Sequence, residues 1–259
     1  MLDKVLNMVY NEYIRYREEN KSNMKFTYLT LDTETCGGFG NPLVYDIGYC
    51  IHDNAGNIFE KRSYVVREIF YGEWKKMKTA YYADKIPFYR QGIKDNMFVV
   101  SSFWRIRNEM LDLMKKYKVR AVIAYNAKFD INALNCTLRH LTYFSLDRPF
   151  FPEDTVVWDT WHMACQTVLN RRSFFKDAVE NDWRSECGNC RTSAEVAYRH
   201  LVRNMDFIES HTALEDAIIE VHIFVKCIAT HQKMTRTIVH MPWKIPQPAF
   251  HAYQEKVAL

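Results

Sequence analysis

Residues 26–34, FTYLTLDTE, are the stretch that decides the fold. β-branched and aromatic residues fill it, as in a buried strand, and its end carries Asp32 and Glu34. Two more runs of this kind follow, VYDIGYCI at 44–51 and FEKRSYVV at 59–66, and the turn-favouring residues of HDNAGN join them. The three runs predict an antiparallel meander.

Farther along the chain, strands and helices alternate. Residues 103–117 carry apolar side chains at helical spacing, and the run AVIAY at 121–125 predicts a strand. TVVWDT at 155–160 predicts a further strand, which leads into the helical pattern of WHMACQTVL. This alternation indicates the α/β class. The stretch 71–96 holds many aromatic residues and lysines, and we expect helix and loop there.

The pattern divides the chain into three parts. Residues 1–23 alternate apolar and charged residues at helical spacing and predict an amphipathic helix with a linker. We expect the main domain over 24–232. Residues 233–259, which include the Pro-interrupted PWKIPQP, predict an extended arm packed on the surface.

Composition narrows the class of protein. The chain has 259 residues, 48% of them hydrophobic and 25% charged, which is typical of a folded globular protein. A net charge of +4 does not by itself indicate a nucleic-acid partner. Seven scattered cysteines favour a reducing compartment. Without a signal peptide or a long apolar stretch, we expect a cytoplasmic protein with no membrane partner.

Four acids carry the signal for chemistry. Asp32 and Glu34, two residues apart on a strand, point to the same face. Asp130 ends NAKFD at a strand-to-helix junction, and Asp216 lies in the first turn of a predicted helix. Clustered carboxylates are the ligands that Mg²⁺ prefers, and two such ions can promote cleavage of a phosphodiester bond. Each acid alone could equally be a turn or helix-cap residue.

His211 stands five residues before Asp216 and directly before Thr212, where the pattern T-A-L-E predicts a capping box and a helix start. A second such pattern begins at Thr192. An imidazole can take a proton from water at neutral pH, so His211 is the candidate general base. Alone, it would be an ordinary loop histidine.

Together the segments LDTET, NAKFD and HTALED resemble the three motifs of the DEDDh branch of the DEDD (DnaQ-like, RNase T-like) 3′→5′ exonuclease superfamily. The five-residue interval from histidine to aspartate is typical of that branch. The resemblance implies an α/β, RNase H-like mixed sheet with flanking helices. It further implies two Mg²⁺ or Mn²⁺ ions held by Asp32, Glu34, Asp130 and Asp216, with His211 as general base.

Further residues are candidates for substrate binding. Phe39 follows the first motif, where the family packs the terminal nucleotide, and it could stack on a base or simply pack. Asn126 could touch substrate or form a turn. Arg171 and Arg172 begin a stretch that interleaves basic and aromatic residues, which suits single-strand binding or a solvated helix face.

The expected partner is single-stranded or 3′-end nucleic acid, with DNA preferred and RNA possible. A homodimer is possible through the leading helix. The alternative class is an inactive exonuclease fold that only binds nucleic acid, although all five motif residues are present. Cys187 and Cys190 have zinc-knuckle spacing without a partner pair, so we expect a turn with two free thiols rather than a zinc site. Asp46 lies on a predicted strand beside the site, where it could serve the site or equally face solvent.

Overall fold

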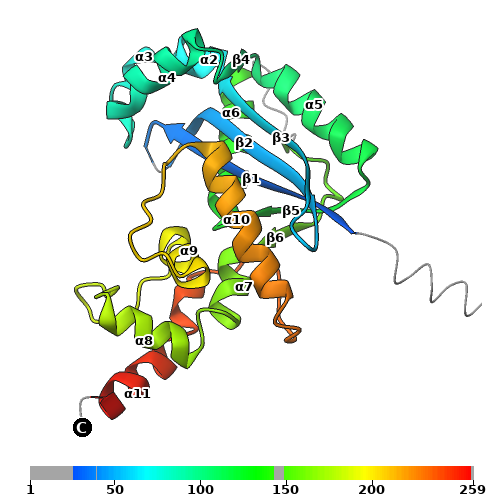
Figure 1. Ribbon diagram of the computed structural model, residues 1–259. Coiled ribbons are helices and arrows are strands. Elements are labelled where there is room, and N and C mark those ends of the chain that lie inside the picture. The colour runs from blue at the N-terminus through cyan, green and yellow to red at the C-terminus, as the bar shows by residue number, and fades with distance from the viewer. Residues whose placement is uncertain (1–25, 39, 143–148, 258–259) are drawn as a thin grey trace, which may run out of the picture.

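A mixed six-stranded sheet forms the centre of the computed structural model, which describes residues 26–38, 40–142 and 149–257 (Figure 1). The strand order is β4-β3-β2-β1-β5-β6. Strands β1, β2 and β3 are antiparallel neighbours, whereas β4, β5 and β6 each run parallel to the strand beside them. The bounds are β1 Thr27–Cys36, β2 Leu43–Asp53, β3 Ile58–Val66, β4 Val99–Ser101, β5 Val119–Ala124 and β6 Val157–Asp159.

Helices cover both faces of this sheet (Figure 1). Their bounds are α2 Arg67–Phe70, α3 Trp74–Met77, η1 Ala83–Lys85, α4 Ile86–Lys94, α5 Phe103–Lys116, α6 Ala127–Leu141, α7 Thr160–Gln166, α8 Arg172–Glu180, α9 Ala194–Val202, α10 Ala213–Ile228, η2 Pro242–Lys244 and α11 Gln247–Val257. The predicted meander and the α/β class are confirmed. No helix in the described ranges is long and apolar enough to cross a membrane.

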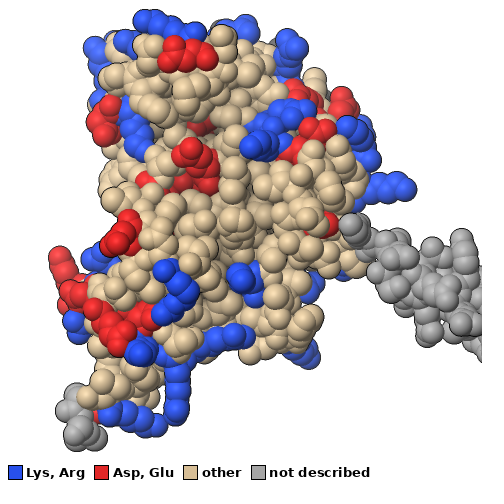
Figure 2. Space-filling view, viewed as in Figure 1, with Lys and Arg blue, Asp and Glu red and all other residues tan. Residues whose placement is uncertain are grey.

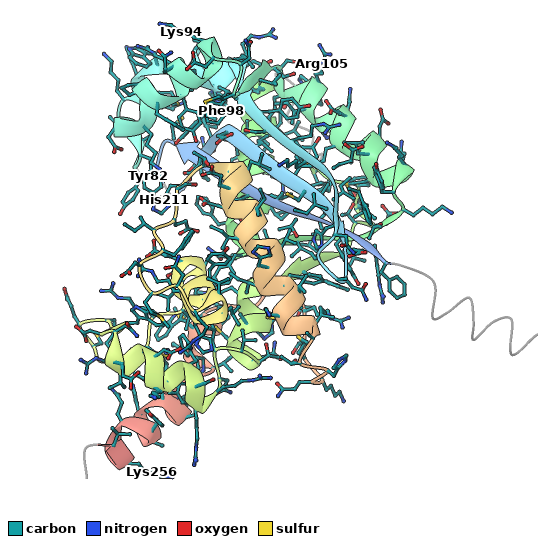
Figure 3. All side chains as sticks on the ribbon, viewed as in Figure 1. Tyr82, Lys94, Phe98, Arg105, His211 and Lys256 are labelled. Carbon is teal, nitrogen blue, oxygen red and sulfur yellow. The ribbon has the colours of Figure 1, made fainter. Side chains whose placement is uncertain are left out.

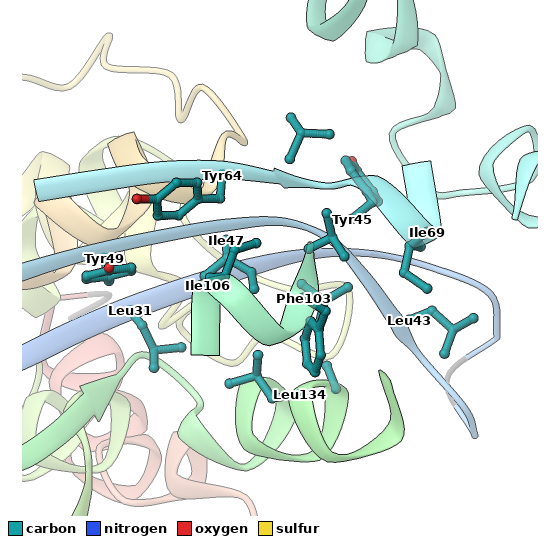
Figure 4. Close-up of a cluster of buried hydrophobic side chains, with 14 of the residues drawn as sticks. Leu31, Leu43, Tyr45, Ile47, Tyr49, Tyr64, Ile69, Phe103, Ile106 and Leu134 are labelled. Atoms are coloured by element: carbon teal, nitrogen blue, oxygen red, sulfur yellow. The ribbon is translucent and has the colours of Figure 1, made fainter. Parts of the chain in front are cut away.

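Side-chain alternation along β1 separates two cores. Leu29 and Leu31 join the core formed with α5 and α6, where Ile106 and Leu134 also lie (Figure 4). Tyr28 belongs to the second core, which includes α10. Because successive strand residues point to opposite faces, Asp32 and Glu34 share the α10 face with Tyr28.

Helix α10 crosses that face in close contact with β2. A Cβ atom on Gly48 would lie 2.0 Å from the backbone nitrogen of Leu214, so only glycine permits this approach. Gly48 is also the register partner of Asp32 on β1. The glycine therefore lets the first turn of α10 lie directly over the acidic end of β1.

The C-terminal segment differs from the sequence prediction. The predicted extended arm over 233–259 contains η2 and α11, and Phe250 of α11 is fully buried against the second core. Its prolines do not prevent helix formation, because Pro242 and Pro248 occupy first-turn positions that need no backbone N–H donor. The predicted N-terminal helix over 1–23 lies outside the described residues.

Candidate active site

The first two motifs meet at the end of β1. Asp32 and Glu34 lie on this strand, and Thr33 between them donates a hydrogen bond of 2.8 Å to Oδ1 of Asp130. Asp130 is in the first turn of α6 and only 2% exposed. The strand that precedes α6, β5, pairs with β1 in parallel, and this pairing brings the second motif to the first.

The third motif completes the cluster from α10. Asp216 lies in the first turn of α10, as predicted, and His211 precedes the helix in the left-handed region at φ 50°. Ligand atoms of Glu34, His211 and Asp216 all lie within 4.8 Å of one another, close enough to contact one ion. The packing of α10 on the sheet thus brings Asp216 close to Glu34 of β1.

Asp46 ties this helix to the sheet. It is fully buried opposite Glu34 on β2, and its Oδ2 accepts hydrogen bonds from the backbone N–H of Ala213 at 3.1 Å and from the Tyr89 hydroxyl at 2.7 Å. Burial raises the pKa of Asp46 to about 6. The residue that the sequence placed beside the site therefore anchors the first turn of α10.

Burial and mutual repulsion govern the charges here. Burial, with the Asp216 carboxylate next in importance, raises the pKa of Glu34 to about 9. Burial and then Glu209 raise the pKa of Asp216 to about 8. The pKa of Asp130 rises to about 7 through burial, although the hydrogen bond from Thr33 opposes the shift. Closely spaced carboxylates in a low-dielectric site disfavour ionisation, and a cation would restore it.

A fifth acid in the cluster escaped the sequence motifs. Glu220 lies one turn beyond Asp216 on α10 and is 2% exposed. Burial and then Asp130 raise its pKa, and its charge in turn raises the pKa of Asp32 after burial and Asp130. The only sequence signal was its i+4 spacing from Asp216, which places both side chains on one helix face.

Two acids of the cluster bury oxygens that have no hydrogen-bond partner in the described part of the chain. Within the described residues, Oδ1 of Asp216 and Oε2 of Glu220 are buried without a hydrogen-bond partner. Buried carboxylate oxygens ordinarily have partners, and an all-oxygen donor set fits hard divalent cations such as Mg²⁺ or Mn²⁺. The residues therefore fit the metal that the motifs imply.

In neither predicted capping box does the threonine side chain cap the helix. Thr212 is the N-cap of α10, but its hydroxyl donates to Glu215 at 3.3 Å and does not cap the helix. At α9 the N-cap is Ser193, whose side chain accepts from the N–H of Val196, because Thr192 receives the indole N–H of Trp161. The second predicted helix start is thus one residue late in the structure.

Of the predicted substrate residues, Arg171 and Arg172 lie away from the acids. Asn126 is exposed at the N-terminus of α6 with φ 66°, and its backbone N–H bonds Asp159, so it forms the turn. Arg171 and Arg172 begin α8, which packs against α11. Figure 1 shows that α8 lies far from the first turn of α10. Phe39 lies outside the described residues.

The CxxC pair is accounted for by its surroundings. Cys190 is buried and its backbone N–H donates to Oε1 of Gln247 at 2.9 Å, whereas Cys187 is exposed. Neither thiol belongs to a group of potential metal ligands among the described residues. Neither of these two cysteines forms a disulfide bond.

Two solved exonuclease structures have a similar fold. E. coli exonuclease I in complex with a 5cy-dT13 oligonucleotide has a TM-score of 0.49 and 14% identity over 90% of this chain and 43% of that chain. Exonuclease X in complex with 5′ overhanging duplex DNA has a TM-score of 0.41 and 17% identity over 80% of this chain and 95% of that chain.

The chain spans less than half the length of the exonuclease I chains that it resembles. No protein-family model matches the sequence, and no curated protein matches it either. At these identities the likeness concerns the fold, so function must be argued from the chain's own residues.

Proposed function

We propose that this chain is a divalent-metal-dependent 3′→5′ exonuclease of the DEDDh type, with DNA as its preferred substrate. One observation carries the proposal. Glu34 and Asp216, 182 positions apart in the sequence, converge with His211 within 4.8 Å, beside Asp130 and Asp32. A structural role would not require so many buried acids without cationic partners.

In this proposal Asp32, Glu34, Asp130 and Asp216 hold two Mg²⁺ or Mn²⁺ ions. When bound, such ions neutralise the charge on the phosphate and lower the pKa of a bound water. His211 accepts the proton of the attacking water. Burial and then Lys85 lower the pKa of His211, which favours the neutral imidazole that can accept a proton at neutral pH.

The 3′ end of the strand would enter beside the first motif. A cavity of about 200 Å³ opens there, lined by Gly37 and Pro42, the exposed ring of Tyr81, and Phe129. Its aromatic walls suit stacking of a terminal base, which does not depend on sequence. Figure 2 shows acidic side chains on this face near the start of α10, with lysines and arginines on the surrounding segments. Those cations would attract the phosphate backbone.

The test uses the full chain and oligonucleotides labelled at the 5′ end, as single- and double-stranded DNA and RNA, with Mg²⁺, Mn²⁺ or EDTA. We expect a ladder of successively shorter labelled products from DNA with either metal and none in EDTA. Release of a labelled mononucleotide at once would indicate the opposite direction. The proposal would be contradicted if no substrate were shortened in a metal-dependent way. Faster shortening of RNA than of DNA would show that RNA is the preferred substrate.

A further inference from the structure

The loop that carries His211 is held by a distant segment of the chain. Residues 203–212 between α9 and α10 contain no helix or strand, and His211 adopts φ 50°. Non-glycine residues rarely adopt this backbone conformation, and it is kept only where the surrounding structure holds it. Contacts from the 71–96 stretch, whose role the sequence left open, supply that support.

Tyr82 contacts the imidazole ring itself. The two rings are stacked, with centroids 4.4 Å apart and an interplanar angle of 19° (Figure 3). The Tyr82 hydroxyl oxygen lies 3.1 Å from Nδ1 of His211. The ring can therefore neither tilt nor turn freely without losing the stack and the hydrogen bond.

Lys85 holds the backbone of the same loop. Its ammonium group donates hydrogen bonds to the carbonyl oxygens of Ser210 and His211, the second at 3.3 Å. Tyr82 and Lys85 are three residues apart across η1, and side chains at this spacing in a 3₁₀ turn lie on one side. One short turn thus contacts both the ring and the peptide groups of the catalytic histidine.

The surroundings of Nδ1 distinguish the two ring nitrogens. Besides the Tyr82 hydroxyl, Oε2 of the half-buried Glu209 lies 3.9 Å from Nδ1. Two oxygens therefore face Nδ1, and each is of a type that accepts a hydrogen bond from an N–H group. A hydrogen bond from Nδ1–H fixes the tautomer in which Nε2 carries the free lone pair.

We propose that Tyr82 and Lys85 are positioning residues for His211: Tyr82 accepts the Nδ1–H and stacks on the ring, Lys85 fixes the loop carbonyls, and Nε2 is left to take the proton of the attacking water. The inference rests on the proposed nuclease function for its consequence in turnover. Its structural part, the tautomer and the fixed ring, can be tested without turnover.

The first test is ¹⁵N NMR of the full chain labelled at its histidines, with His211 assigned by the signals lost in His211→Gln. We expect a protonated Nδ1 and an unprotonated Nε2, and in Tyr82→Phe a shift of the Nδ1 signal toward a mixture of tautomers. An Nε2–H tautomer in the wild type, or unchanged His211 signals in Tyr82→Phe, would overturn the inference, whether or not the protein is a nuclease.

The second test is a double-mutant cycle on single-turnover rate and substrate affinity. If Tyr82 acts through His211, Tyr82→Ala lowers the rate by about tenfold or more, up to the roughly 10²- to 10⁴-fold that a general base contributes, and leaves substrate affinity unchanged. The same change in a His211→Ala background then costs nothing further. A cost that persists in that background, or a loss of affinity, would assign Tyr82 to substrate binding and overturn the inference.

Two matched controls exclude a general effect on the segment. Tyr71→Phe removes a hydroxyl from an exposed tyrosine of the same stretch, and Lys94→Met removes a charge at the other end of α4, far from His211 (Figure 3). Neither should alter the His211 signals or the rate, whereas Lys85→Met should lower the rate. Thermal melting of every variant reports whether it folds. If Tyr82→Ala does not, Tyr82→Phe, with an expected loss of about threefold, decides the outcome.

Discussion

Two regions of the molecule bury carboxylates, but among the described residues only one of them supplies hydrogen-bond partners for every carboxylate oxygen. Between α8 and α9, Asp177 is 3% exposed and fully paired: its Oδ2 accepts from Nδ1 of His200 at 2.5 Å, and Arg203 donates to both carboxylate oxygens. At the start of α10, Asp216 and Glu220 each bury an oxygen without a partner in the described part of the chain. The first arrangement is complete within the protein, whereas in the proposed function a bound cation would complete the second.

The contrast separates structural acids from functional ones. An acid that holds two helices together needs its cations in the same chain. An acid that binds a metal is not fully paired by cations of its own chain, and burial, followed by repulsion from neighbouring carboxylates, then raises the pKa values of Glu34 and Asp216. Removing an acid from each region should therefore have opposite consequences.

The largest expected effect is on turnover at the α10 site. Asp216→Asn should lower nuclease activity by about 10³-fold or more, because charge stabilisation by metal ions contributes several kcal/mol. Its melting temperature in EDTA should not fall, because folding at neutral pH must protonate the Asp216 carboxyl, whose pKa is raised to about 8, and asparagine removes that cost. Glu215→Gln, at the exposed neighbouring position, is the control and should retain activity. Substantial activity in Asp216→Asn would remove this acid from the metal site.

The next effect is on stability at the paired site. Asp177→Asn weakens the buried hydrogen bond with His200 and removes the charge that pairs with Arg203, whose side chain is 61% exposed, so it should destabilise the fold by about 1–3 kcal/mol. Chemical denaturation measures the loss. Activity per folded molecule should be unchanged. A stable but inactive variant would show that Asp177 takes part in the activity and is not only a structural acid.

The sequence could predict the acids but not what surrounds them. Asp32, Glu34, Asp130, His211 and Asp216 were predictable because each lies in a short motif at a fixed place on a strand end or helix start. Contacts between distant positions leave no such local pattern. Tyr82 meets His211 across 129 residues, and nothing in the 71–96 stretch indicated it.

The parts of the fold that escaped prediction have similar causes. Strand β4 has three residues, too few for an alternation to be recognised. Helix α11 begins with prolines, which suggested an extended arm although they are tolerated in a first turn. The basic residues Arg171 and Arg172 suited a nucleic acid by composition, yet composition does not say where α8 lies relative to the acids.

A third effect is on the pH dependence of stability without metal. Glu34 and Asp216 have folded-state pKa values of about 9 and about 8, above their ordinary values of 4.5 and 3.8. Between the ordinary and the folded-state pKa values, the folded state therefore binds more protons than the unfolded state. The free energy of unfolding then falls as pH rises through this range. Melting in EDTA should show the decline from about pH 4 to about pH 9.

The two regions again predict different slopes. Asp216→Asn should flatten the decline in EDTA, and saturating Mg²⁺ should flatten it for the wild type by binding only the ionised, folded form. Asp177→Asn should keep the slope of the wild type. Stability that rises with pH in EDTA would show that the α10 carboxylates are ionised without a metal.

The smallest effect concerns Glu220. Glu220→Gln keeps the size of the side chain but removes its charge, so metal affinity should fall by about tenfold to a hundredfold, as for residues that support a metal site. Calorimetric titration with Mn²⁺ measures the affinity. The variant should also melt at a higher temperature in EDTA, because a buried acid is gone. Unchanged affinity would make Glu220 a purely structural residue.

Isothermal titration of Mn²⁺ into the metal-free full chain measures whether the acids at the start of α10 bind metal. We expect saturable binding of two ions to the wild type and to Asp177→Asn, and weakened or lost binding in Asp216→Asn. Binding that is absent from the wild type, or that Asp216→Asn leaves intact, would contradict the proposed metal binding.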